Sequence, residues 1–138
     1  MQKVEKEAAR RSRVKRIVGT LSESPVFVEG QHDKRACMEL GIEAITFNAA
    51  MYNNLDIDTS KTLYLIMDRD KGGKKNEAKL TSVLLEKYPE SKIDTVLGKN
   101  LLSLLRSAHV EEIVAPYREL TDSSAVKRKK AIRWQKHI

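Results

Sequence analysis

Two carboxylates stand at the end of the most apolar stretch of the sequence. In "LYLIMDRDKGGKK", residues 63–75, five apolar or aromatic residues lead directly into Asp68 and Asp70. Aspartate and glycine both disfavour strands, so the acidic pair is expected just past the carboxyl end of a buried strand. In proteins Mg²⁺ is held by one or two carboxylates together with waters and substrate phosphates. The pattern therefore predicts a Mg²⁺ site at Asp68 and Asp70, with Mn²⁺ as the alternative cation.

A second acidic pair follows another short apolar run, in "PVFVEGQHD", residues 25–33. Glu29 is expected at the end of that strand, and Asp33 in the first turn of the following helix, where the helix dipole favours negative charge. If the two strands are neighbours in a parallel sheet, all four carboxylates converge at one edge. Crowded carboxylates raise each other's pKa, and a bound divalent cation removes that cost.

Glycines and basic side chains surround the pair at 68 and 70. Gly72 and Gly73 allow a sharp turn and a close approach of the backbone to a ligand. Basic groups at this position are suited to hold the phosphate on which a bound metal acts. The expected nucleic-acid contacts near the site are Arg69, Lys71, Lys74 and Lys75.

Positive charge is concentrated at the two ends of the chain, whose net charge is +7. Residues 1–24 carry seven Lys or Arg and three Glu, and residues 121–138 carry six and one, so the ends hold +4 and +5. The body, residues 25–120, carries 13 basic and 15 acidic residues, a net charge of −2. Basic ends on a near-neutral body favour a nucleic-acid partner, although such charges also serve solubility. The expected phosphate contacts in the C-terminal stretch are Lys127, Arg128, Lys129, Lys130 and Arg133.

Strand and helix patterns alternate along the chain. This alternation predicts an α/β fold, a single Rossmann-like domain in which helices cover both faces of a four-stranded parallel sheet. The expected strands are residues 25–30, 43–48, 62–67 and 92–97. The expected helices are residues 3–21, 31–41 and 73–88, with one or two more short ones in residues 100–120.

The length of 138 residues suits one compact domain. We expect a basic N-terminal helix in residues 1–24, the α/β domain in residues 25–120, and a basic C-terminal helix or arm in residues 121–138. No apolar run approaches the ~20 residues of a membrane span, and no signal-peptide pattern is present. With the single Cys37 excluding an internal disulfide, we expect a cytoplasmic protein without a membrane partner.

The three histidines follow no zinc-binding spacing. Only His32 lies beside one of the acidic motifs, where it is a candidate phosphate contact or proton carrier. His109 has no partner that the sequence indicates.

The sequence does not match three other known kinds of phosphate or cation site. No G-x-x-x-x-G-K-[ST] motif occurs, which excludes a P-loop. The twelfth position counted from Asp68 is Lys79, where an EF-hand requires glutamate. An aspartyl phosphatase would place a small hydroxyl residue after the second aspartate, where Lys71 and Gly72 stand. Taken alone, the D-x-D-x-G pattern is also consistent with a solvated turn.

The two acidic motifs together resemble the Toprim domain. "VFVEGQHD", residues 26–33, has its E-G-x-x-D pattern, and "LIMDRDKGG", residues 65–73, has its D-x-D-x-x-G pattern. Toprim domains occur in topoisomerases, bacterial-type primases, some repair proteins and small maturation nucleases of ribosomal RNA. The match covers residues 25–97, and the chain looks most like the small stand-alone archaeal, primase-like Toprim proteins.

The resemblance implies a role for each matching residue. Glu29 would be the general acid or base, and Asp68 and Asp70 would be metal ligands. The residues that would support the site are Gly30, Asp33, Gly72 and Gly73. The transesterifying tyrosine domain of topoisomerases and the zinc-binding region of primases are not found in this sequence.

The function expected from this reasoning is Mg²⁺-dependent action on nucleic-acid phosphodiesters, most simply as an endonuclease in RNA or DNA processing. One alternative is a non-catalytic nucleic-acid-binding subunit of an RNA-processing or replication assembly. Another is a primase-like nucleotidyltransferase. A protein partner in a larger assembly is expected to assist substrate selection, because a short chain has little surface for it.

Overall fold

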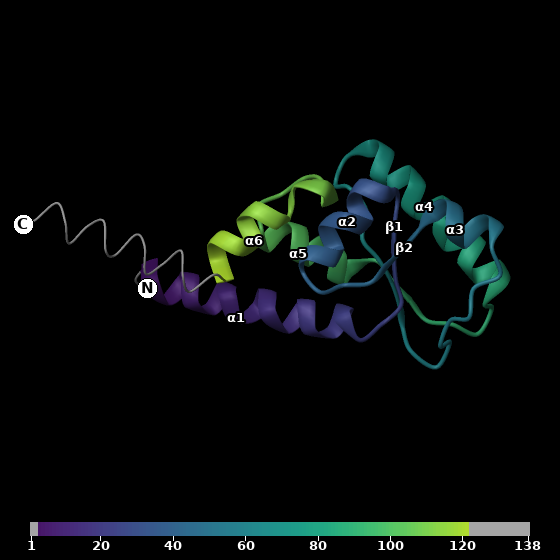
Figure 1. Ribbon diagram of the computed structural model, residues 1–138, viewed down its shortest axis with the longest axis horizontal. Coiled ribbons are helices and arrows are strands. Elements are labelled where there is room, and N and C mark those ends of the chain that lie inside the picture. Colours follow the sequence, from purple (N-terminus) through teal and green to yellow (C-terminus); the bar gives the residue numbers. More distant parts are fainter. Residues whose placement is uncertain (1–2, 122–138) are drawn as a thin grey trace, which may run out of the picture.

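Four short parallel strands form one sheet in the computed structural model, which describes residues 3–121 (Figure 1). The order across the sheet is β2-β1-β3-β4, and each neighbouring pair is parallel. The predicted α/β class and the parallel four-stranded sheet are therefore confirmed. The strands are β1 (Val26–Val28), β2 (Ala44–Thr46), β3 (Leu63–Leu65) and β4 (Ile93–Asp94).

Helices connect the strands and cover both faces of the sheet. Between residues 3 and 121, every helix is too short or too polar to cross a lipid bilayer. The helices are α1 (Lys3–Ser22), α2 (Gln31–Glu39), α3 (Phe47–Tyr52), α4 (Lys71–Lys87), α5 (Val96–Leu104) and α6 (Val114–Thr121), with a 3₁₀ turn η1 (Val110–Glu112).

The strands are shorter than predicted and several helix boundaries differ, and capping aspartates explain two of these differences. The strand expected over residues 92–97 ends at Asp94, whose Oδ1 accepts hydrogen bonds from the N–H groups of Val96 and Leu97 at 2.8 Å. That carboxylate satisfies free donors at the start of α5 and so favours helix over strand. Helix α4 begins at residue 71 rather than 73, because Asp70 caps its first turn.

Side chains alternate between the two faces of the sheet, as a strand requires. In β1, Val26 and Val28 pack into the cluster formed with α1, α2, α5 and α6, whereas Phe27 packs into the cluster formed with α3 and α4. Figure 1 shows the same division, with α3 and α4 on one side of β1 and β2. Helix α1 has one apolar face, whose four residues are buried: Val14, Ile17, Val18 and Leu21.

The order of the strands reverses between β1 and β3. From β1 the chain passes through α2 to β2, and then returns past β1 to β3 on the other side. Right-handed crossovers in opposite directions place α2 on the opposite face from α3 and α4. Helices α2 and α4 therefore leave the sheet on opposite faces beyond β1 and β3, which is where ligands bind in such sheets.

Helix α2 ends in a glycine cap. Gly41 has a φ of 82°, and its N–H donates to the carbonyl of Met38 at 3.0 Å, while Ile42 donates to the carbonyl of Cys37 at 3.0 Å. This pairing closes the helix in a left-handed turn that glycine adopts without steric cost. Burial raises the pKa of the Cys37 thiol to about 12, so it acts as a small apolar side chain.

Candidate functional site

The pairing of β1 with β3 brings the two acidic motifs together. Val26 is level with Tyr64 and Phe27 with Leu65. Continued by two residues, this register places Glu29 level with Met67, one residue before Asp68. The prediction that strands one and three are neighbours, with acids at their carboxyl ends, therefore holds.

A segment from the C-terminal third of the chain fixes the position of Asp68. Its Oδ1 accepts a hydrogen bond from the N–H of Val110 at 2.8 Å. The N–H of Arg69 donates to the carbonyl of Ala108 at 2.9 Å. These two bonds attach the loop after β3 to the start of η1 and the residues before it, and the first bond fixes the Asp68 carboxylate.

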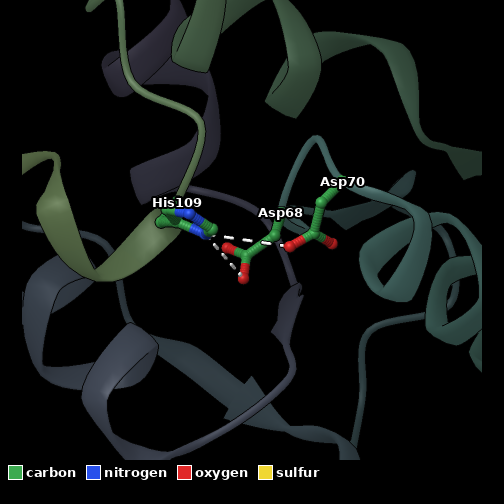
Figure 2. A group of neighbouring side chains, drawn as sticks. All are labelled: Asp68, Asp70 and His109. Atoms are coloured by element: carbon green, nitrogen blue, oxygen red, sulfur yellow. Dashed lines mark ion pairs between the residues drawn. The ribbon is translucent and has the colours of Figure 1, made fainter.

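His109 joins the two aspartates on this segment. Its Nδ1 lies 3.3 Å from Oδ2 of Asp68 and 4.0 Å from Oδ2 of Asp70 (Figure 2). One ligand atom from each residue lies within 4.8 Å of the others, a spacing that a single metal ion could bridge. Sequence reasoning missed His109, because a lone histidine so far along the chain belongs to no motif. Only its residue type marks it as a candidate ligand.

The neighbouring carboxylates favour the charged form of the imidazole. The hydrogen bond with Asp68 and the charge of Asp68 raise the pKa of His109, with smaller contributions from Glu112 and Asp70. Desolvation lowers the pKa of His109, by more than either Glu112 or Asp70 raises it. Since a metal ligand must be the neutral imidazole, cation binding at Nδ1 would release this proton.

Asp70 has two tasks at once. Its Oδ1 accepts a hydrogen bond from the N–H of Gly73 at 2.7 Å and so caps α4, while its Oδ2 faces His109. The close turn requires glycine at 73, since a Cβ there would lie 2.0 Å from the carbonyl oxygen of Asp68. A Cβ at Gly72 would make only an ordinary contact of 3.5 Å with the Asp70 side chain.

Glu29 lies beside this group without belonging to the three-residue cluster. Its Oε1 accepts a hydrogen bond from Nδ2 of Asn76, on the second turn of α4, at 2.6 Å. Partial burial raises the pKa of Glu29, as do the charges of Asp68, Asp33 and Asp70, in that order. The hydrogen bond from Asn76 lowers it. Asn76 is a second residue that sequence reasoning missed, because its partner is on another element.

Asp33 lies in the first turn of α2, as predicted, and its side chain is almost entirely buried. Its Oδ2 accepts a hydrogen bond from the N–H of Gly30 at 3.2 Å, which stabilises the turn after Glu29. Burial raises the pKa of Asp33, and the charges of Asp68 and Glu111 act in the same direction. A Cβ at Gly30 would meet no atom within 4 Å, so packing does not require glycine there.

The basic residues predicted near the site are all exposed. None has an acidic partner within ion-pair distance among residues 3–121, so their charges are available to a ligand. They are Arg69, Lys71, Lys74 and Lys75. The other predicted contacts lie outside the described residues: Lys127, Arg128, Lys129, Lys130 and Arg133.

Comparisons with known proteins bear on the fold alone. No protein-family model matches the chain, and no curated protein matches it. A solved chain from Aquifex aeolicus, which carries no functional name, is similar in structure. It is 19% identical, with a TM-score of 0.51, and the match covers 73% of this chain and 94% of that one. The likeness defines a shared α/β architecture.

Proposed function

We propose that this protein is a metal-dependent enzyme that hydrolyses nucleic-acid phosphodiesters, and that it is an endonuclease of the Toprim type. The observation that carries the proposal is the meeting of Glu29 with Asp68 and Asp70 where β1 and β3 end side by side. Binding of nucleic acid requires basic groups or a metal but no proton carrier. A carboxyl group beside a candidate metal cluster therefore favours chemistry over binding alone.

The donor set fits a divalent cation. Carboxylate oxygens suit Mg²⁺ and Mn²⁺ alike, whereas an imidazole nitrogen suits Mn²⁺ better, because Mg²⁺ strongly prefers oxygen. Asp68, Asp70 and His109 would hold the ion. We propose Mg²⁺ or Mn²⁺ as the cofactor, with His109 favouring Mn²⁺. When bound, the ion would polarise a phosphoryl oxygen and stabilise the negative charge that develops on it.

The side chains of the protein would perform the remaining steps. Glu29 would accept a proton from the attacking water as the new phosphorus–oxygen bond forms. The sugar oxygen would leave as the scissile bond breaks, and it would receive a proton from solvent or from Glu29. Asn76 would hold the Glu29 carboxylate in place. Arg69, Lys71 and Lys74 would bind flanking phosphates without selecting bases.

The test is cleavage of labelled structured RNA, single-stranded DNA and duplex DNA, with Mg²⁺, Mn²⁺ or EDTA. Cleavage is expected only with a divalent cation, and Glu29→Gln should lower the rate by about 100-fold or more, the usual loss of a general acid or base. Tight binding without cleavage in every condition would instead favour a nucleic-acid-binding subunit. Incorporation of nucleotides would favour a primase-like transferase.

We place the protein in the cytoplasm, with a protein partner supplying substrate selection.

A further inference from the structure

A hollow of mixed polar and apolar lining lies beside α1, separate from the acidic cluster. It has a volume of about 380 Å³. Helix α1 supplies Arg13, Arg16, Ile17 and Thr20, and the other wall is formed by Tyr64 of β3, Asp94 of β4 and Leu97 of α5. We call these seven residues the α1 groove.

The arginines of α1 fall into two groups with different tasks. Nε of Arg10 donates to the carbonyl of Leu104 at 2.6 Å, and Nε of Arg11 donates to the carbonyl of Leu120 at 2.8 Å. These carbonyls lie at the ends of α5 and α6, where the last turn of a helix lacks internal donors and carries partial negative charge. Arg10 and Arg11 therefore serve the fold.

Arg13 and Arg16 remain available. Both are exposed, and neither has an acidic partner within ion-pair distance among residues 3–121. They are three residues apart on one helix, so their side chains are neighbours on the same face. Two adjacent guanidinium groups repel each other, and an anion between them relieves that repulsion. The planar fork of arginine matches the oxygens of a phosphate.

The opposite wall of the groove indicates a ligand larger than a free phosphate. Asp94 uses Oδ1 to cap α5, and its Oδ2 has no hydrogen-bond donor among the described residues. A carboxylate would weaken the binding of a simple anion, but it accepts hydrogen bonds from the amino group of a base. Tyr64 and Leu97 add apolar surface, on which a base can stack. Bases in a duplex are already stacked, so this combination fits an unpaired nucleotide.

We propose that the α1 groove binds a single-stranded segment of the nucleic-acid substrate, with Arg13 and Arg16 on its phosphates and Tyr64 against a base. This proposal rests on the proposed function, since it assumes that the ligand is nucleic acid. It adds a binding surface outside the acidic cluster and a class of substrate, one that contains an unpaired segment.

The test is fluorescence anisotropy with a labelled 20-nucleotide single strand and with a blunt duplex of the same sequence, in EDTA to prevent cleavage. The variant is Arg13→Ala with Arg16→Ala. The matched control is Lys6→Ala with Lys15→Ala, which removes the same charge from exposed positions of α1 outside the groove. Melting temperatures verify folding, and neither pair should change them, because none of the four side chains has a partner among the described residues.

The arginine variant should bind the single strand about tenfold more weakly at physiological salt, as expected for two lost charge-assisted contacts. Its log–log salt slope should flatten by about 1.4, at roughly 0.7 per lost phosphate contact on a single strand. The control pair should leave that slope unchanged, and duplex binding should change little in either variant. Equal behaviour of the two variants, or an equal loss on the duplex, would overturn the groove proposal.

The two proposals can fail separately. If the wild-type protein binds neither nucleic acid, both are overturned. If it cleaves nucleic acid but the arginine variant binds as the control does, the groove alone is wrong. Asp68→Asn with Asp70→Asn should retain the groove-dependent binding, because no groove residue contacts either aspartate.

Discussion

Asn76 donates a hydrogen bond from Nδ2 to Oε1 of Glu29 at 2.6 Å, so that a side chain of α4 holds the carboxylate at the end of β1. The bond links the end of β1 to the helix that follows β3, and so joins the two acidic motifs. It joins the candidate proton carrier to the helix whose first turn is capped by Asp70.

Replacing Asn76 by alanine should raise the pKa of Glu29 further, because the hydrogen bond to the carboxylate is the contribution that lowers it. Carboxyl NMR titration of the metal-free protein would measure the change. Asn100→Ala is the control, since Asn100 is an exposed asparagine on α5. An identical Glu29 titration in Asn76→Ala and wild type would show that the bond does not form in solution.

Asp33→Asn should stabilise the metal-free protein at neutral pH. Burial and neighbouring charges raise the pKa of Asp33, so the folded protein disfavours its ionised form, while an asparagine oxygen can still accept the bond from Gly30. The sign follows from linkage: the destabilisation is present above the folded pKa and disappears as the pH falls below the unfolded pKa of about 3.9. Melting temperatures at pH 7 and pH 3.5 would measure this. A gain that persists unchanged at the lower pH would contradict it.

Gly73→Ala should destabilise the protein by roughly 1–3 kcal/mol, the usual cost of an overpacked site. The added Cβ would meet the backbone of Asp68 at 2.0 Å, so the loop that carries the site would have to move. Gly72→Ala, one position earlier on the same helix, should be neutral or stabilising, because it makes only an ordinary contact. Denaturant unfolding of the two variants decides the matter, and equal free energies of unfolding would contradict the close turn.

His109→Ala should weaken Mn²⁺ binding by about 10- to 100-fold, at least the loss usual for a residue that supports a metal ligand. Mg²⁺ binding should change less, because that ion gains little from an imidazole. His32→Ala is the control, since His32 is exposed and absent from the three-residue cluster. Calorimetric titration with each ion would measure both affinities. An equal loss for Mg²⁺ and Mn²⁺ would assign His109 to orienting Asp68 rather than to metal selection.

The sequence predicted those parts of the site that follow from local pattern. An apolar run that ends in acid marked both strand ends, and the rule for parallel sheets placed Glu29 and Asp68 at one edge. His109 and Asn76 were missed because each meets its partner only through the packing of distant elements. The strand expected over residues 92–97 exists but ends early, because the Asp94 cap, a local polar effect, opposed the apolar pattern of the residues after it.

Contacts between distant elements also explain why the arginines of α1 have different roles. Composition predicted a basic helix, but only the packing of α5 and α6 against it reveals that Arg10 and Arg11 bind carbonyl groups. Net charge therefore overstated the positive surface that α1 offers to nucleic acid.

Binding of a divalent cation by Asp68 and Asp70 is measured by Mn²⁺ titration of wild type and of Asp68→Asn with Asp70→Asn. The control is Asp56→Asn with Asp58→Asn, a second D-x-D pair in an exposed loop. We predict one Mn²⁺ per chain, a melting temperature that rises with Mn²⁺ because only the folded state binds it, and loss of about 100-fold or more in affinity when both ligands are replaced. The control should bind as wild type does. If the Asp68 and Asp70 variant bound Mn²⁺ as tightly as wild type, or if wild type bound none, Asp68 and Asp70 would not be the ligands of a divalent cation.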